Sequence, residues 1–392
     1  MKVKTRYESF GGIICWEEPP ALFYVDKQFM REFGYKDSLL WRKRTNYLSA
    51  PTEIHFSITN DCPMHCQHCY VDSGEKLKRE LTTNEIKKAI SILSSMQVFH
   101  IALGGGEPFA RKDCLEIAHY CREKGLVPNI TTNGYYITEK LAKECRVFGQ
   151  INVSMDGIGE YYKLSRGHNG FPIADKALRL LTKYNPRVGI NCVVSRDNFE
   201  HIPKLVEYAK KLNLHSILFL RYKPTGRAKE LYQKRHITKE QGIKLLPLII
   251  QLAIQNSIRL YIDCSFTPML YYHKIHPKIL DYISTHGCVA GDSLAGTLAD
   301  GRINACSFAQ GDGGFIFSIK KEWHSNPHFI RFRNWIKSAP EPCKSCDYLK
   351  LCRGGCHVVS EYVLGDFNAP DPGCPWVQEY NQKSERRQYV KG

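Results

Sequence analysis

The chain has 392 residues, of which 43% are hydrophobic, and it exceeds the usual size of a single globular domain. No segment approaches the roughly 18 apolar residues of a membrane span, and the N-terminal sequence MKVKTRYESF lacks the apolar core of a signal peptide, so we expect a cytoplasmic protein with no membrane partner. The formal charge of +16 is spread along the chain, which predicts a basic surface suited to an acidic partner rather than a nucleic-acid site.

The N-terminal segment 1–47 is predicted to be a small appendage of a hairpin and a helix. Its residues 11–26, GGIICWEEPPALFYVD, read as two short strands around a Glu-Glu-Pro-Pro turn.

The next segment, about residues 52–222, alternates short β-rich runs with longer amphipathic helical runs. One helical run, TTNEIKKAISILSSM, begins with Thr82 and Glu85 at capping-box spacing. Six strand–helix units in series imply a parallel sheet, either open and doubly wound or closed into a partial barrel. The predicted strands are residues 52–59, 100–105, 127–134, 150–156, 188–195 and 216–222.

After Tyr222 we expect the strand–helix alternation to stop. A helical stretch, ITKEQGIKLLPLIIQLAIQN, leads into a region rich in cysteine and glycine, about residues 287–375. The predicted units are the appendage 1–47, a barrel 48–235, a helical connector 236–285, a cysteine-rich domain 286–380 and a basic tail 381–392.

Sixteen cysteines in a long chain without an export signal favour metal binding over disulfides. Cys62, Cys66 and Cys69 form a C-x3-C-x2-C pattern in the loop after the first barrel strand. His65 and His68 could complete a zinc site, since zinc takes four ligands. Alternatively, the three thiolates could hold three irons of a [4Fe–4S] cluster and leave the fourth iron open.

The second barrel strand ends in GGGEP, residues 104–108. Consecutive glycines let a backbone approach a ligand closely, and a glutamate can pair with a ligand ammonium group. With the cysteine pattern, this strand end resembles the radical S-adenosylmethionine (SAM) enzymes over about residues 52–222. The resemblance implies a partial (β/α)6 TIM-type barrel in which the open iron chelates SAM. Cleavage of SAM then yields a 5'-deoxyadenosyl radical that abstracts hydrogen from a substrate.

The same resemblance implies site residues. The cluster ligands are Cys62, Cys66 and Cys69. The expected SAM contacts are Gly105, Gly106 and Glu107 in GGGEP, Asn133 in TTNG, Ser154 and Asp156 in VSMDG, and Arg166 in SRGHNG. Asn and Asp before Gly are also common turn residues, and a loop arginine is commonly solvated, so these contacts have a purely structural alternative. In this reading His65 and His68 take no part in metal binding.

The C-terminal cysteines follow the spacing C-x12-G-x4-C, gap, C-x2-C-x5-C-x3-C, gap, C. A zinc ribbon would account for four of these seven cysteines. The spacing resembles the SPASM domain of some radical SAM enzymes, which carries two auxiliary [4Fe–4S] clusters. By motif order the resemblance assigns Cys288, Cys306 and Cys356 to auxiliary cluster I, and Cys343, Cys346, Cys352 and Cys374 to auxiliary cluster II.

Three clusters and SAM leave one iron of auxiliary cluster I without a cysteine from these motifs. The position could be open, or bound by Asp292 or Cys264; an open or non-cysteine site is our expectation, because Cys264 lies upstream of the motif. Cys114, Cys121, Cys145 and Cys192 fall in predicted barrel elements and are interpreted as buried hydrophobic residues.

The resemblance also bears on substrates and partners. SPASM-bearing enzymes mostly modify ribosomally made peptides or proteins, which predicts a precursor peptide or protein substrate and a ferredoxin or flavodoxin-type electron donor. The alternatives are a tetrapyrrole or metal-cofactor substrate, a non-catalytic iron–sulfur electron carrier, and a zinc-ribbon nucleic-acid binder. Sulfatase maturases carry a catalytic Asp where this chain has Ser307, so that activity is not expected. No catalytic side chain is assigned.

The appendage offers one clue to a peptide. Related enzymes often pair a leader peptide with the edge strand of a winged-helix element. Fewer than 50 residues precede the barrel here, too few for a complete element. A hairpin that only covers the barrel is the preferred interpretation.

Overall fold

The computed structural model describes residues 3–18, 20–45, 47–282 and 285–389. Pro19, in the predicted appendage turn, lies outside these ranges. The core is a nine-stranded sheet with the strand order β10-β9-β8-β7-β6-β5-β4-β11-β12. The six predicted barrel strands are present, and each pairs in parallel with the next. They are β4 (Glu53–Thr59), β5 (His100–Gly105), β6 (Val127–Thr132), β7 (Ile151–Ser154), β8 (Val188–Val194) and β9 (Ser216–Arg221).

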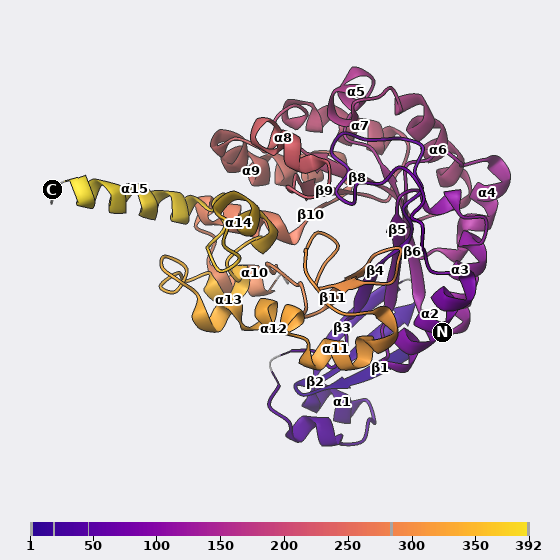
Figure 1. Ribbon diagram of the computed structural model, residues 1–392, viewed down its shortest axis with the longest axis horizontal. Helices are drawn as coiled ribbons and strands as arrows, with labels where there is room; N and C mark the ends of the chain where they lie inside the picture. The colour runs from indigo at the N-terminus through magenta and orange to yellow at the C-terminus, as the bar shows by residue number, and fades with distance from the viewer. Residues whose placement is uncertain (1–2, 19, 46, 283–284, 390–392) are drawn as a thin grey trace.

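Helices cover the outer, convex face of this sheet (Figure 1). On β4, Ile54, Phe56 and Ile58 are fully or almost fully buried, whereas Glu53, His55 and Ser57 alternate with them and are only half-buried. The half-buried side chains therefore line the inner, concave face. The helices are α2 (Thr83–Ser95), α3 (Cys114–Glu123), α4 (Glu139–Glu144), α5 (Glu160–Arg166), α6 (Phe171–Tyr184) and α7 (Ile202–Lys211), with short turns η2 (Pro108–Ala110), η3 (Cys145–Val147) and η4 (Phe199–His201).

Local sequence signals explain where these helices begin. Thr82 and Glu85 form the predicted capping box at the start of α2, in which each side chain accepts a hydrogen bond from the other residue's backbone N–H. The four cysteines predicted to be hydrophobic, Cys114, Cys121, Cys145 and Cys192, are at most 1% exposed. They pack in the main core, as free cysteines commonly do.

The appendage contains one strand more than the sequence predicted. A three-stranded antiparallel sheet of β1 (Val3–Glu8), β2 (Gly11–Glu17) and β3 (Pro20–Asp26) is followed by α1 (Lys27–Glu32) and η1 (Leu39–Arg42). β1 lacks an apolar face because it buries Arg6 and Glu8, which form an ion pair. Because of these charged residues, an analysis of hydrophobic alternation does not detect β1.

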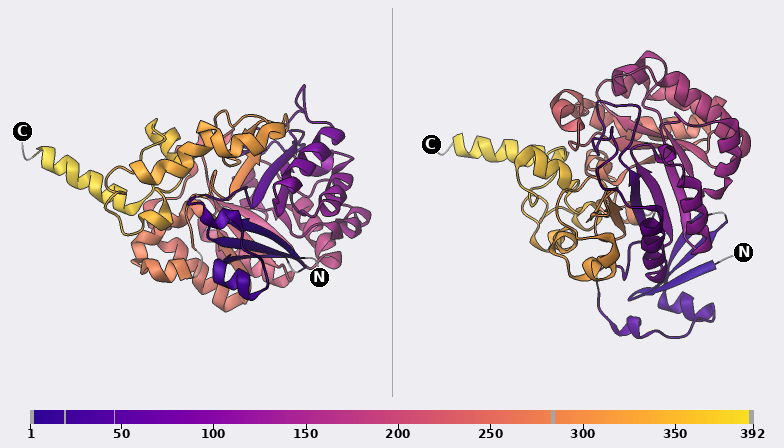
Figure 2. Two further views of the ribbon diagram at one scale, coloured as in Figure 1. Left: turned by 90° about the horizontal axis from the view of Figure 1, so that it is seen from below. Right: turned by 45° about the vertical axis from the view of Figure 1, so that its right-hand side comes forward.

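The appendage covers the amino-terminal ends of the barrel strands (Figure 2). Arg6 donates to the carbonyls of Ala50 and Pro51, just before β4, and Lys4 donates to the carbonyl of Val98, just before β5. The appendage therefore lies at the end of the barrel opposite the cysteine loop, which follows β4.

The expectation that the alternation stops after β9 is corrected by the structure. β10 (Arg259–Ile262) continues the parallel sheet next to β9. Beyond β4, β11 (Leu294–Thr297) pairs in parallel with it and β12 (Ile303–Asn304) pairs with β11. All three missed strands are short: β10 and β11 have four residues each, with a glycine in β11, and β12 has two, so none produces a clear period-two pattern.

The cysteine-rich segment lies across the open, concave side of the barrel (Figure 1). The last helix, α15, continues through the predicted basic tail as far as Tyr389. No helix in the described ranges is long and apolar enough to span a membrane. The remaining elements are α8 (Ala228–Arg235), α9 (Lys239–Asn256), η5 (Cys264–His273), α10 (Pro277–Tyr282), η6 (Ile316–Ser318), α11 (Ile319–Ser325), α12 (Pro327–Asn334), η7 (Trp335–Ser338), α13 (Leu349–Cys352), α14 (His357–Leu364) and α15 (Pro375–Tyr389).

Candidate active site

The first cysteine loop follows the carboxyl end of β4, and its first cysteine, Cys62, stands three residues after Thr59. The backbone N–H of Cys62 donates to the carbonyl of Gly74 at 2.8 Å, and that of Cys69 donates to the carbonyl of Cys66 at 3.2 Å. Burial, together with the charges of Cys66, Glu107 and Cys69, raises the pKa of the Cys62 thiol to about 11. The loop therefore gathers the three predicted thiols into one group.

The glycines of GGGEP are required by a close approach between β5 and this loop. A Cβ atom on Gly106 would lie 2.2 Å from the carbonyl oxygen of Asp61, and Gly105 has φ +114°. The N–H of Gly106 donates to the carbonyl of Thr59, and that of Glu107 donates to the carbonyl of Asp61. Both amide hydrogens are thus used within the protein, and the carbonyl oxygens of this strand end are the groups left for a ligand.

The carboxylate of Glu107 is completely buried between the ends of β5 and β6. It accepts hydrogen bonds from the Thr132 hydroxyl at 2.7 Å, the Asn133 N–H at 2.7 Å and the Phe109 N–H at 3.2 Å. Burial nevertheless raises the pKa of Glu107 to about 7. Since a carboxylate has about four acceptor positions, at most about one remains for a ligand ammonium group.

Asp156 and Arg166 form a buried ion pair beside the cysteine loop, with Arg166 Nε 2.9 Å from the Asp156 carboxylate. His68 Nε2 lies 3.1 Å from the same carboxylate. Although burial opposes ionisation of Asp156, the neighbouring Arg166 and His68 lower its pKa to about 2. His68, expected to be uninvolved, therefore helps to anchor the loop, whereas His65 is exposed.

Polar side chains reach two of the thiols directly. Arg166 donates to the Cys66 sulfur at 3.6 Å, and Asn133 donates to the Cys62 sulfur at 3.5 Å. His168 Nε2 lies 3.2 Å from the Cys66 sulfur and was not singled out from the sequence, although it stands two residues after Arg166. Ser154 ends β7 on the half-buried side of the strand.

The second cysteine region contains two groups. Four thiols predicted for auxiliary cluster II line one pocket together with Tyr271, Tyr348 and Trp376. These thiols belong to Cys343, Cys346, Cys352 and Cys374.

The three cysteines predicted for auxiliary cluster I form the other group. Burial, together with the charges of Cys306 and Cys356, raises the pKa of the Cys288 thiol to about 12. The assignment of these three cysteines to auxiliary cluster I stays a prediction.

The first loop and the second cysteine region are in contact. The ring of Tyr70, directly after Cys69, lies 4.7 Å from the ring of Phe308, two residues after Cys306. Lys223, just beyond β9, places its Nζ 4.2 Å from the centre of the Phe308 ring. Phe308 therefore lies between the loop of the first group and the end of the barrel.

The inner wall of the barrel also meets the second cysteine region. His55 on β4 lies with its Nδ1 2.6 Å from the hydroxyl of Ser307, directly after Cys306. Asn191 on β8 donates to Thr131 on β6. The wall thus carries hydrogen-bonding side chains, with one imidazole next to the C-terminal segment.

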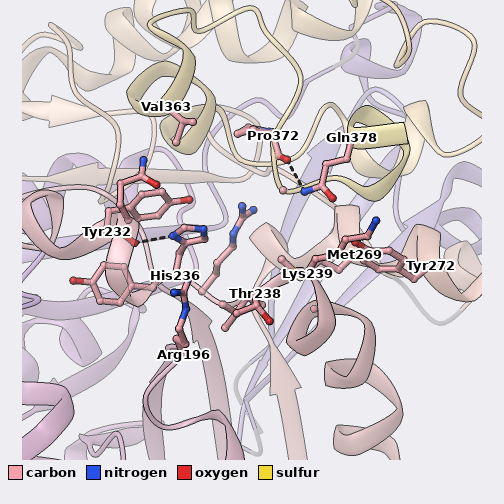
Figure 3. A pocket seen from close by; sticks show the side chains of 16 residues that line it. Arg196, Tyr232, His236, Thr238, Lys239, Met269, Tyr272, Val363, Pro372 and Gln378 are labelled. Carbon is pink, nitrogen blue, oxygen red and sulfur yellow. Dashed lines mark hydrogen bonds between the residues drawn. The ribbon is translucent and has the colours of Figure 1, made fainter. Parts of the chain in front are cut away.

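A separate pocket of about 350 Å³ lies between helices α8–α9 and the C-terminal helices α14 and α15 (Figure 3). Tyr232, His236, Met269 and Tyr272 contribute to its lining. None of the predicted cysteine ligands lines it, so it lies outside the site built by the two cysteine regions.

A single metal ion is a poor fit to these cysteines. Across the described ranges, no three His, Cys, Asp or Glu side chains converge closely enough to hold one ion. Zinc would require four ligands about 2.0–2.3 Å from one centre. Iron–sulfur clusters bind each thiolate to a different iron, so their ligands stand further apart. The thiol groups fit clusters better than zinc.

The parallel half-barrel, the cysteine loop after its first strand and the glycine-rich end of its second strand define the radical SAM enzymes. Residues 56–209 match the model of the Radical SAM superfamily. Residues 56–209 are thus a radical SAM domain, which implies a [4Fe–4S] cluster and SAM, and a cysteine-rich C-terminal region follows this domain.

Similar proteins cover nearly the whole chain. The mycofactocin maturase MftC of Mycolicibacterium smegmatis is 28% identical over 88% of this chain and 87% of its own length. The AdoMet-dependent heme synthase of Methanosarcina barkeri is 28% identical over 83% of this chain and 97% of its own. The structure of Streptococcus suis SuiB bound to the precursor peptide SuiA has a TM-score of 0.76 at 18% identity, covering 95% of this chain and 98% of SuiB. The last likeness shows a shared fold.

Proposed function

We propose that this enzyme cleaves SAM at a cluster held by Cys62, Cys66 and Cys69 and abstracts hydrogen from a ribosomally made peptide or protein during its maturation. The observation that supports the chemistry is the placement of these three cysteines in one loop after β4, where Asn133 donates to the Cys62 sulfur and Arg166 to the Cys66 sulfur. The cluster supplies an electron to the sulfonium of bound SAM. The protein's own groups then orient SAM and keep the site dry.

The buried polar groups around the loop have separate tasks in this proposal. The carbonyls at Gly105 and Gly106, with the remaining acceptor position of Glu107, bind the amino group of SAM. Arg166, held by Asp156, attracts the carboxylate of SAM. Asn133 and Ser154 are placed for hydrogen bonds to the rest of the molecule.

The two further cysteine groups are proposed to hold auxiliary [4Fe–4S] clusters I and II. Cys343, Cys346, Cys352 and Cys374 surround one pocket, as ligands of one cluster should. An acidic ferredoxin or flavodoxin-type protein is the proposed electron donor, since the chain carries a formal charge of +16.

A peptide substrate is supported by the relatives. One similar protein is named a maturase, and the similar SuiB structure contains a precursor peptide. The heme synthase favours a second candidate, in which the same chemistry acts on a tetrapyrrole. Radical cleavage of SAM is common to both candidates, so substrate identity needs its own test.

The test is anaerobic incubation of the reconstituted enzyme with SAM and dithionite. One set of reactions contains peptides encoded next to its gene, and a parallel set contains an iron coproporphyrin. We expect a mass change in a peptide that depends on both SAM and Cys62, Cys66 and Cys69. Conversion of the porphyrin with no change in any peptide would overturn the peptide assignment in favour of the second candidate.

A further inference from the structure

Auxiliary cluster I has three cysteines from the motif and needs a fourth ligand for its last iron. Asp292, one candidate from the sequence, is engaged elsewhere. Its carboxylate lies 2.7 Å from Arg353 Nη1, in an ion pair that is partly buried. Recruiting Asp292 to iron would leave the Arg353 guanidinium without its counter-charge.

Cys264 is the other candidate, and it occupies a fixed position at the start of η5, directly after β10. Asp263 caps this turn by accepting from the N–H of Ser265 at 3.0 Å. The same carboxylate forms an ion pair with Lys223, whose Nζ lies over the ring of Phe308. These contacts connect Asp263, the residue before Cys264, to the segment that contains Cys306.

Ser265, the residue after Cys264, is connected to Cys356 through two side chains. Arg221 donates to the carbonyl of Ser265 at 3.0 Å and forms a fully buried pair with Asp371. Asp371 in turn accepts from the backbone N–H of Cys356 at 2.9 Å. Three successive contacts through Arg221 and Asp371 therefore fix the distance between the Cys264 and Cys356 segments.

A third connection leads to Cys288. The Thr267 hydroxyl, in the first turn of η5, donates to the carbonyl of His286 at 3.1 Å. His286 stands two residues before Cys288 in the chain. All three motif cysteines of cluster I are thus linked to the turn that begins at Cys264.

We propose that Cys264 is the fourth ligand of auxiliary cluster I, so that cysteine holds all four irons and none is open to substrate. The inference rests on the auxiliary clusters of the proposed function and is independent of the substrate. A fully ligated cluster of this kind can exchange electrons with its surroundings, but it offers substrate no iron to bind.

The test uses the full chain carrying Cys62→Ala, Cys66→Ala and Cys69→Ala. All iron and every paramagnetic signal of this parent variant then come from the auxiliary clusters. This parent should hold about eight irons after anaerobic reconstitution. Its electron paramagnetic resonance spectrum in the reduced state should not change when cyanide, a ligand for open iron sites, is added. A parent variant that binds no iron would contradict the auxiliary clusters of the proposed function. Failure of the proposed function is thereby distinguished from failure of the Cys264 assignment.

Adding Cys264→Ala to this parent should either remove about four irons or make the spectrum respond to cyanide. Cys264→Ser, which keeps a weaker oxygen ligand, should shift the spectrum even where the iron is retained. Cys145→Ala is the matched control, because Cys145 also begins a 3-10 helix and is buried away from both cysteine groups.

Combination with Cys288→Ala shows which cluster is affected. If both Cys264 and Cys288 bind cluster I, the parent carrying this pair of substitutions should retain about four irons, with the spectrum of cluster II unchanged. Three results would each overturn the inference: a parent that responds to cyanide, a Cys264→Ala variant identical to the parent, or a pair that loses all its iron.

Discussion

The rings of Tyr70 and Phe308 lie 4.7 Å apart, centre to centre, and join the first cysteine loop to the segment that follows Cys306. Neither ring belongs to a cysteine motif. Their contact brings the C-terminal domain against the loop that we propose to hold the SAM-binding cluster, so the two cysteine regions meet in the folded chain.

Phe308→Ala should weaken the contact between the two cysteine regions. Loss of the Tyr70 contact and of the Lys223 interaction is expected to destabilise the fold by about 2 kcal/mol, less than for a fully buried phenylalanine because Phe308 is half-buried. Chemical unfolding of the cluster-free protein measures the change. Phe315→Ala, at a phenylalanine that is 36% exposed, is the control. Equal losses in the two variants would show that the Tyr70 contact contributes nothing.

His55 is expected to accept a proton from substrate, because its imidazole lies on the inner wall within 2.6 Å of Ser307. His55→Ala should lower product formation by about 10²-fold, the usual contribution of a positioned base, without lowering 5'-deoxyadenosine formation. Parallel chromatography of both products checks this split. If both fell together, His55 would be needed for SAM cleavage rather than for substrate.

Glu107 should make the stability of the cluster-free protein depend on pH. Burial raises its pKa to about 7 from 4.5, so its contribution is fully present below pH 4.5 and is lost as the pH rises through 7. Relative to wild type, Glu107→Gln should therefore gain about 3 kcal/mol in free energy of unfolding between pH 4.5 and 8. Urea unfolding across this range measures the difference, with the exposed Glu116→Gln on α3 as control. A constant difference between the Glu107 variant and wild type would contradict this assignment.

Asp156→Asn should be costly because it leaves the buried Arg166 guanidinium without a counter-charge. Removal of one partner from a buried pair costs about 3–5 kcal/mol. Asp175→Asn is the matched control, since Asp175 pairs with Arg179 at a similar distance but at the surface, where a pair contributes about 1 kcal/mol or less. Thermal unfolding of both variants compares them. Similar losses would mean that the Asp156 pair is not buried in solution.

The sequence predicted the barrel well because its strands and helices have clear apolar periods. The six strands from β4 to β9 appear in the predicted order, and the Thr82 capping box starts α2 as expected. β1 was missed because it buries Arg6 and Glu8, and β10 and β11 because each has only four residues. The cysteine assignments depend on fixed spacing alone, which needs no knowledge of the fold, and they stay predictions.

Contacts between distant segments could not be predicted. His68 and Asp156 are 88 positions apart, and Arg221 and Asp371 are 150 apart, yet each pair meets in the folded chain. The glycines of GGGEP were expected to serve a ligand, whereas their first requirement is the close approach of Asp61. The position of Cys264, proposed here as a cluster ligand, follows from β10, a strand that the sequence did not reveal.

The most direct test of the account is SAM cleavage by the anaerobically reconstituted full chain with dithionite. The wild type should release 5'-deoxyadenosine and hold about twelve irons. Replacement of Cys62, Cys66 and Cys69 by alanine should abolish the release while about eight irons remain. Continued formation of 5'-deoxyadenosine by the triple variant would contradict the assignment of this loop as the SAM-binding cluster site.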